Sequence, residues 1–315
     1  MKFLHTADLH YGAAPDAKRP WGRERAQAVK DGFARVISAC RNENIDMLLI
    51  AGGLFDDGCT AEEFNEVNRA FAGIPKTEVY VLAGAEGSKT ADADDDGFEW
   101  APNVKYCPQS STEIPECGIL LARNEEIKEN EIPKTYSYAA YGGAHKTHVY
   151  NAGKAVNAGS PVPMGPADAG KHGFYIGEIN EGKLTALKFV MISDVRYITL
   201  VVNVTPVSTC EEVKKTLRAE MKRRGEKNIY TVKLCGNCGP DAAFDLEELK
   251  YEFRVDEIYN KTEARYDYVR IFRDHSSDMV GFFVKEMNTE NKSELQKKAL
   301  NYGVDALLRT ADERL

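Results

Sequence analysis

Two polar side chains follow the first predicted strand at a spacing that suits metal binding. The stretch HTADLH places Asp8 and His10 at the end of this strand. Residues i and i+2 of a strand share a face, so we expect the carboxylate and the imidazole to converge. Together they would supply half of a metal site. A D-x-H pair is frequent by chance, and the wider arrangement of the chain must decide its meaning.

A second candidate loop follows the next predicted strand, in the stretch LLIAGGLFDDG. A buried strand over 45–50 runs into a tight turn at Gly52 and Gly53. Loops at the carboxyl ends of strands are where α/β proteins usually place their chemistry. This turn nevertheless offers no ligand before Asp56.

The elements that must position these loops alternate between strand and helix up to about residue 190. The pattern predicts strands at 2–9, 45–51 and 78–84, with helices at 23–43 and 61–72. Apolar residues recur at helical spacing on one face of the first helix. A β-α-β-α-β order predicts a layered α/β core, and the segment 119–180 is rich in predicted strands.

A second unit is expected from about Arg196 onward. Ser208 and Glu211 predict a capping box for a helix that ends at Arg224. Strands are predicted at 197–204, 228–236 and 251–260. A second capping pattern lies at Asp245 and Glu248. Two terminal helices are expected at 278–287 and 292–308.

The order and spacing of these segments resemble the calcineurin-like metallophosphoesterases. The segments that carry the resemblance are HTADLHYG, IDMLLIAGGLFD, VYVLAGAEGS, YAAYGGAHK, AGSPVP and KHGFYIGEI. They are most similar to the DNA-repair exonuclease branch, the bacterial SbcD-type and YhaO-type proteins. The resemblance implies a four-layer β-sandwich flanked by helices over residues 1–193, with a smaller α/β capping domain over 196–315.

The family resembled hydrolyses phosphodiesters with two divalent metals, typically manganese, that share a bridging carboxylate. Its first motif, D-x-H, is intact as Asp8 and His10. Its second, G-D-x-x-D, has Gly53 at the bridging position and keeps only the second-shell aspartate, Asp56. One of the two anionic groups expected at the centre is therefore missing.

The later motifs of the family are also incomplete. In G-N-H-D the metal-binding asparagine is replaced by Ala85 and the catalytic histidine by Glu86. In G-H-x-H the first histidine is Gly143, and the second survives as His145. Among the resembled positions, the retained groups Asp8, His10 and His145 all match ligands of one metal. Two dications need anionic ligands between them, so the sequence predicts no dinuclear centre.

Two interpretations of the retained trio stay open. Two histidines and one carboxylate can bind a single zinc, manganese or iron ion; alternatively, the three side chains only hydrogen-bond to one another. Glu86 is a weak candidate for a catalytic acid or base, and a surface glutamate is the simpler interpretation. His148 and His172 lie near the last motif but match no ligand, and we interpret both as structural.

Charge and cysteine content limit the partners. The net charge of −8 argues against binding through a broadly basic surface, so nucleic acid would bind locally or through a partner. The helix 209–224 carries six basic residues and is the local candidate, although a solvated face is the simpler interpretation. The acidic residues Asp57 and 92–96 could replace lost ligands. The seven cysteines show no framework spacing, and we interpret Cys235 and Cys238 as part of a turn.

Three functions are compatible with this pattern. The first is a scaffold subunit of the exonuclease type with little or no catalysis; the resemblance implies a coiled-coil ATPase partner, DNA, and possible homodimers. The second is a phosphoesterase that uses one metal at Asp8, His10 and His145. The third is a metal- or small-ligand-binding module. The sequence shows no apolar run that could span a membrane and no signal peptide, so we expect a cytoplasmic protein.

Overall fold

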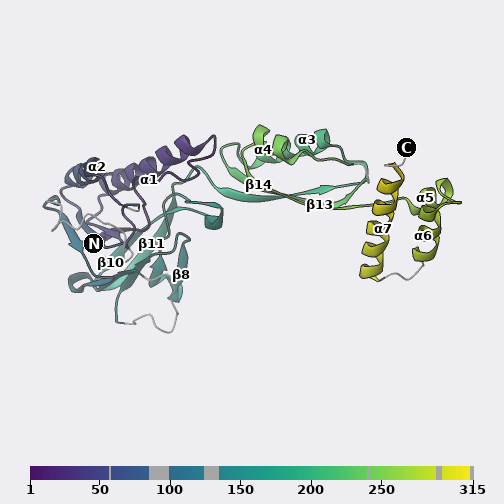
Figure 1. Cartoon of the computed structure of the whole chain (residues 1–315). Helices are drawn as coiled ribbons and strands as arrows, with labels where there is room; N and C mark the ends of the chain where they lie inside the picture. The colour runs from purple at the N-terminus through teal and green to yellow at the C-terminus, as the bar shows by residue number, and fades with distance from the viewer. Residues whose placement is uncertain (57, 85–98, 124–134, 240–241, 289–292, 313–315) are drawn as a thin grey trace. The chain divides into compact units, whose positions relative to one another are not determined.

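The computed structural model describes residues 1–315 except 57, 85–98, 124–134, 240–241, 289–292 and 313–315. The chain divides into two compact units, Met1–Tyr197 and Ile198–Leu315 (Figure 1). The sequence places the boundary between residues 193 and 196. No helix of the described residues is both long enough and apolar enough to cross a membrane.

The first unit is built on a six-stranded sheet in the order β11-β10-β1-β2-β3-β4. Strands β1 to β4 run parallel to one another. Strand β10 pairs antiparallel with β1, and β11 pairs antiparallel with β10. Their bounds are β1 Lys2–Thr6, β2 Met47–Ile50, β3 Glu78–Leu82, β4 Val104–Cys107, β10 Gly173–Asn180 and β11 Lys183–Met191. All four residues of β2 are buried, as expected for a strand covered on both faces.

Two helices cover one face of this sheet: α1 Gly22–Asn42 and α2 Ala61–Ala72. Both lie on the same side of the first unit (Figure 1). Phe33 and Val36 of α1 and Phe64 and Phe71 of α2 pack with Leu48 of β2 in one apolar cluster. Helix α2 begins where the sequence predicts, because Thr60 and Glu63 form a complete capping box there.

A second, five-stranded sheet packs on the other face, in the order β5-β6-β7-β9-β8. Its strands are β5 Ser111–Ile114, β6 Ile119–Arg123, β7 Tyr138–Gly142, β8 His148–Tyr150 and β9 Ala155–Asn157. Phe3 and Leu49 of the first sheet meet Leu121 and Tyr138 of the second. Helices and two packed sheets confirm the predicted mixed α/β class, and the described residues form the layers helix, sheet and sheet.

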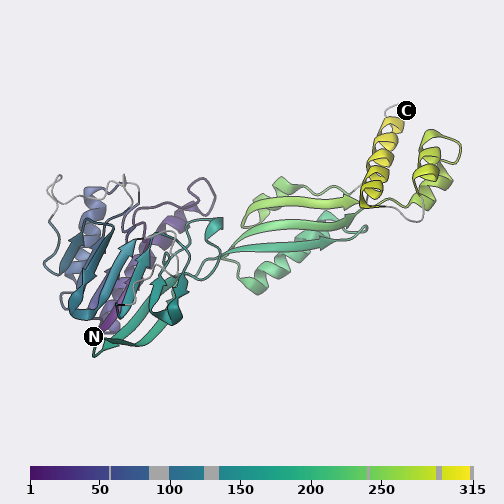
Figure 2. The same cartoon turned by 90° about the horizontal axis from the view of Figure 1, so that it is seen from below.

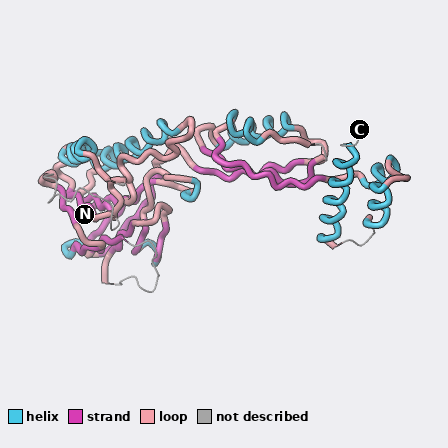
Figure 3. The backbone as a smooth tube through the Cα atoms, in the orientation of Figure 1, coloured by secondary structure: helices cyan, strands magenta, loops and turns pink. Residues whose placement is uncertain are grey.

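The second unit contains a three-stranded sheet and five helices within the described residues (Figures 2 and 3). The sheet order is β12-β13-β14, and β13 and β14 are parallel. The strands are β12 Tyr197–Val204, β13 Ile229–Cys238 and β14 Val255–Ala264; the helices are α3 Cys210–Arg224, α4 Leu246–Glu252, α5 Tyr268–Asp274, α6 Met279–Met287 and α7 Glu294–Asp312. Val213 and Leu217 of α3 pack on this sheet.

Several local predictions in this unit are wrong. The capping box of α3 is formed by Thr209 and Glu212, one residue later than expected. Helix α5 precedes the two expected terminal helices, and residues 251–252 belong to α4 rather than to a strand. Cys235 and Cys238 lie within β13 and not in a turn, and both are free.

Most of the basic side chains of helix α3 form ion pairs with glutamates. Lys214 is buried and lies 2.7 Å from Glu248, with Glu211 and Glu252 also within ion-pair distance. Arg218 pairs with Glu252, and Arg223 and Arg224 both pair with Glu220. This face therefore presents much less free positive charge than its composition suggests.

One buried titratable group predicts how stability depends on pH. His5 is fully buried in β1, where Nδ1 accepts a hydrogen bond from the Tyr138 hydroxyl and Nε2 donates to the carbonyl of Tyr141. Burial lowers its pKa from 6.5 to about 3. Below pH 6.5 the unfolded chain therefore binds a proton that the folded chain does not bind, and stability falls as the pH falls towards 3.

We expect His5→Gln to remove this pH dependence, because glutamine keeps one acceptor and one donor but does not titrate. Between pH 7 and pH 5 the wild type should lose about 2 kcal/mol more unfolding free energy than the variant, measured by urea denaturation. The exposed His148 supplies the control, since His148→Gln should follow the wild type. Parallel curves for wild type and His5→Gln would contradict this account.

Candidate functional site

The two retained side chains of the first motif lie in a loop and not on a strand, contrary to the prediction. Strand β1 ends at Thr6, and Asp8 and His10 both have positive φ, +48° and +44°. Non-glycine residues seldom adopt this conformation, and they concentrate at functional sites. The backbone N–H groups of Asp8 and His10 donate to the carbonyls of Gly52 and Gly53, at 3.0 and 2.8 Å. The loop after β1 is thus fixed on the glycine turn after β2.

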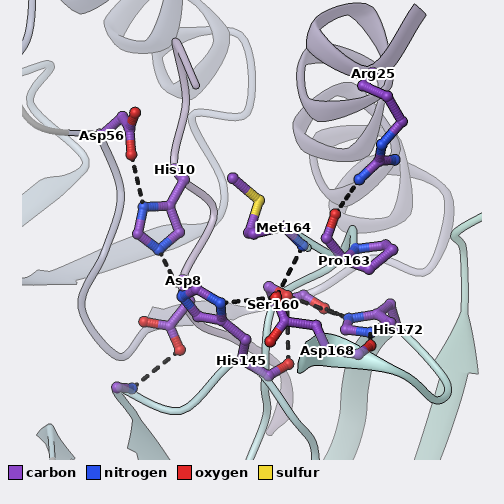
Figure 4. Close-up of polar contacts among 11 residues, drawn as sticks. Asp8, His10, Arg25, Asp56, His145, Ser160, Pro163, Met164, Asp168 and His172 are labelled. Carbon is purple, nitrogen blue, oxygen red and sulfur yellow. Dashed lines mark hydrogen bonds and ion pairs between the residues drawn. The ribbon is translucent and has the colours of Figure 1, made fainter. Parts of the chain in front are cut away.

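A pair of facing imidazoles forms the centre of the site (Figure 4). His10 Nε2 and His145 Nε2 are 3.1 Å apart. On their far sides, His10 Nδ1 contacts Asp56 Oδ1 at 3.2 Å and His145 Nδ1 contacts Asp168 Oδ2 at 2.9 Å. The four side chains therefore form a continuous chain of carboxylate, imidazole, imidazole and carboxylate.

This chain of contacts restricts where protons lie. A carboxylate accepts hydrogen bonds, so each Nδ1 carries hydrogen and both Nε2 atoms are left with lone pairs that face each other. A proton or a cation between the two Nε2 atoms resolves this opposition. The hydrogen bond to Asp168 raises the pKa of His145, and the charges of Asp168, Asp8 and Asp56 act in the same direction, while burial opposes them. His145 is therefore well suited to hold the shared proton.

Asp168 is a site residue that the sequence analysis did not identify. Its Oδ2 accepts hydrogen bonds from His145 and from the backbone N–H of Met164 at 2.9 Å. Burial raises its pKa, but the His145 and Met164 hydrogen bonds and nearby positive charge outweigh burial and lower it overall. It belongs to a segment without regular strands, and no spacing pattern connects it with His145. The nearest sequence signal is the AGSPVP stretch at 158–163, one of the segments that carry the resemblance.

His172 holds the segment that carries Asp168, in agreement with its structural interpretation. It is buried, with Nε2 2.6 Å from the carbonyl of Asp168 and Nδ1 2.9 Å from that of Ser160. The fully buried Arg25 of α1 contributes from the other side by donating to the carbonyl of Pro163. These contacts, drawn in Figure 4, fix the position of the carboxylate behind His145.

Asp8 is buried beside the imidazole pair. Its Oδ2 accepts the backbone N–H of Gly143 at 3.0 Å. Burial raises the pKa of Asp8, and this effect exceeds the opposing influence of the Gly143 hydrogen bond and of the charges of His145, His10 and Arg123. The backbone of the loop after β7 therefore supplies a hydrogen-bond partner of Asp8.

The space at Gly53 is closed to a bridging carboxylate. Gly53 has φ +61°, and a Cβ atom added there would lie 2.8 Å from both Cα and Oδ1 of Asp8. Contacts this short do not occur for real Cβ atoms, so any side chain at position 53 must displace Asp8. Position 53 therefore supplies no side chain to a metal ion, and its backbone lies against Asp8.

The residues present do not fit the dinuclear metal centre that the resemblance implies. Positions 53 and 143 offer only backbone, and no group of three or more His, Cys, Asp or Glu in the described part of the chain is arranged to hold a metal ion. The facing imidazoles are the nearest approach to a ligand set. Two nitrogens bound tetrahedrally to one zinc would be about 3.3 Å apart, close to the 3.1 Å between His10 and His145 Nε2.

The remaining predicted site residues are not part of the imidazole pair and its carboxylates. Ala85, Glu86, Asp57 and the run 92–96 lie outside the described residues, so their roles stay predictions. His148 is exposed and its ring lies against Tyr150, with 4.4 Å between the ring centroids.

Comparisons with known proteins match parts of the chain. Residues 1–111 match the model of the calcineurin-like phosphoesterase family. No curated protein matches the chain. Among solved structures, YfcE, a phosphoesterase from E. coli, is 13% identical; the alignment covers 60% of this chain and 99% of that chain, with a TM-score of 0.37. The family match covers about a third of the chain and includes the loops after β1 and β2.

The carboxylate behind His145 yields a testable prediction. Asp168→Asn removes a negative charge and the strongest acceptor of the His145 Nδ1 proton, so we expect the pKa of His145 to fall in chelator-treated protein. Proton NMR titration of the imidazole measures this change. Asp194→Asn is a suitable control, because Asp194 is exposed and pairs with Arg35. An unchanged His145 pKa in Asp168→Asn would show that the carboxylate does not act on the pair.

Proposed function

We propose that this chain is a DNA-repair exonuclease-type phosphoesterase homologue whose dinuclear centre has been lost. In this proposal the chain acts as a scaffold subunit with little or no nuclease activity of its own. The observation that carries the proposal is the closure at Gly53, where the bridging carboxylate is absent and Asp8 occupies the space that its Cβ atom would need. A two-metal mechanism depends on anionic ligands between the ions, and this position cannot supply one.

The other replaced positions support the same conclusion. Gly143 offers Asp8 a backbone N–H in place of an imidazole. His10 and His145, which match ligands of one metal, contact each other directly. The resemblance further implies a coiled-coil ATPase partner and contact with DNA. The intramolecular ion pairs of α3 favour a route to DNA through a partner over direct binding by this helix.

Metal content tests the proposal directly. After incubation with manganese and zinc and then desalting, we expect elemental analysis to find fewer than two metal ions per chain. A matched assay should find no manganese-dependent degradation of linear DNA. Two ions per chain, or robust nuclease activity, would show that ligands outside the resembled positions complete a dinuclear centre.

Restoring the bridging residue alone should not restore activity. Gly53→Asp places a side chain against Asp8, in a backbone conformation that costs an L-residue about 1–2 kcal/mol. We therefore expect a lower free energy of unfolding by denaturation and no gain in DNA degradation. Gly58→Asp is the matched control, because Gly58 also has positive φ but its Cβ would meet nothing within 4 Å. Gly53→Asp should be the less stable of the two variants, and manganese-dependent nuclease activity in it would refute the proposal.

A specific observation favours a second candidate, a phosphoesterase that uses one metal. Each imidazole of the facing pair is backed by a carboxylate at Nδ1, the arrangement that orients metal-binding histidines. In this candidate His10 and His145, with Asp8 beside them, would hold a single zinc or manganese ion. When bound, such an ion acts as a Lewis acid toward a phosphoryl oxygen.

Histidine variants separate the two candidates. If one metal binds, His145→Ala should lose it and His148→Ala should keep it, because only His145 faces His10 Nε2. Metal content per chain is the measurement. Equal content in both variants would exclude the imidazole pair as the metal site and leave the scaffold as the better-supported function.

A further inference from the structure

A buried polar contact holds the last residue of the first unit. Tyr197 ends this unit and is also the first residue of β12, whose remaining residues belong to the second unit. Its side chain is buried, and its hydroxyl donates to Asp16 Oδ2 at 2.6 Å. Burial and this hydrogen bond raise the pKa of Tyr197, so the hydroxyl keeps its proton and remains a donor. The start of β12 is therefore held by the loop between β1 and α1.

Three groups approach the same oxygen of Asp16. Trp21 Nε1 donates to Oδ2 at 3.0 Å, in addition to the Tyr197 hydroxyl. These two contacts fill the two lone-pair sites of this oxygen. Arg25 Nε lies 3.6 Å from the same atom, within ion-pair distance but beyond a hydrogen bond, and Arg25 Cζ lies 5.6 Å from the centroid of the Tyr197 ring. Tyr197 and Trp21 therefore keep the guanidinium group from bonding to this oxygen.

The same guanidinium group holds the segment that carries Asp168. Arg25 is fully buried, and its Nη2 donates to the carbonyl of Pro163 (Figure 4). The next residue, Met164, donates its backbone N–H to Asp168 Oδ2 at 2.9 Å. Because this carboxylate also contacts His145 Nδ1, one side chain of α1 connects the start of β12 with the imidazole pair.

The backbone at Asp16 indicates that this arrangement depends on its contacts. Asp16 has φ +58°, which non-glycine residues seldom adopt. Such conformations persist where the surrounding structure holds them, and they concentrate in switch regions and functional sites. The contacts of the Asp16 side chain with Trp21, Arg25 and Tyr197 supply that support.

We propose that Tyr197 and Arg25 are positioning residues, which make the carboxylate behind the imidazole pair depend on how the first residue of β12 is held. While Tyr197 occupies Asp16, Arg25 donates to Pro163 and keeps the following segment in place. Withdrawal of the hydroxyl frees a lone pair of Asp16. The guanidinium group then moves to it, because a carboxylate is a stronger acceptor for an arginine than a backbone carbonyl, and Pro163 loses its donor.

This inference goes beyond the proposed function, because it concerns control of the site and not its chemistry. It holds whether His10 and His145 share a proton or bind one metal ion, since Asp168 orients His145 in both cases. A displacement of β12 at its first residue therefore changes the site through residues of the first unit alone.

Exchange of the Met164 backbone N–H with solvent, measured by NMR on the full chain in the presence of a chelator, tests the inference. Tyr197→Phe removes only the hydroxyl, and we expect this N–H to exchange about tenfold faster, the effect of losing one hydrogen bond. Tyr80→Phe is the matched control, because Tyr80 is a buried tyrosine of β3 whose hydroxyl contacts Lys105 Nζ at 2.8 Å. The control should exchange as wild type does.

The two tryptophans of the chain show how far the effect of Tyr197→Phe extends. The indole N–H signal of Trp21 should shift, because it shares its acceptor with the lost hydroxyl, while that of Trp100 should not. A shift at Trp21 with wild-type exchange at Met164 overturns the coupling, and no change at either overturns the role of Tyr197. Equal acceleration at Met164 and in β7 shows general destabilisation, which also overturns the inference.

A second variant tests the step from Arg25 to the Asp168 segment. Lysine keeps the charge but lacks the planar fork that faces Asp16 and Pro163 together, so we expect Arg25→Lys also to accelerate Met164 exchange about tenfold. Arg23→Lys, at an exposed position of the same helix, is its control. Wild-type exchange in Arg25→Lys overturns the role of the guanidinium group. These measurements need neither bound metal nor DNA degradation, so their failure is distinguishable from failure of the proposed function.

Discussion

The site depends on backbone hydrogen bonds between the loop after β1 and the glycine turn after β2. The N–H groups of Asp8, His10 and Tyr11 donate in sequence to the carbonyls of Gly52, Gly53 and Leu54. This ladder continues the parallel pairing of β1 and β2 beyond the ends of both strands. It forces Asp8 and His10 into positive φ, and the buried strands on either side keep them there. The orientation of both side chains follows from this constraint.

The same constraint explains why position 53 has no room for a side chain. Because Gly53 accepts from His10 and faces Asp8, its Cβ direction points at the atoms that a bridging carboxylate would need to approach. The imidazoles of His10 and His145 meet close by, and each has a carboxylate at its Nδ1 atom.

Groups from several segments of the chain balance the negative charge of Asp8. Asp8 has a backbone N–H from Gly143 and the charges of the imidazole pair, and Arg123 adds a cation from β6. These groups come from three segments: the loop after β1, the loop after β7 and the end of β6. A single substitution in any of them should therefore alter the charge balance of the others.

The sequence by itself determined the class of fold, most of the elements of the first unit and four of the residues that meet at the site. Periodicity and capping residues are local signals, and helix α2 begins and ends where they predict. Local signals gave the wrong residue where two adjacent residues could both cap a helix, as with Ser208 and Thr209 at the start of α3. Only the tertiary structure decided that Asp8 and His10 lie in a left-handed loop, that Asp168 supports His145, and that Arg123 extends over Gly52. Each of these depends on contacts between segments far apart in the chain, and no periodic pattern records such contacts.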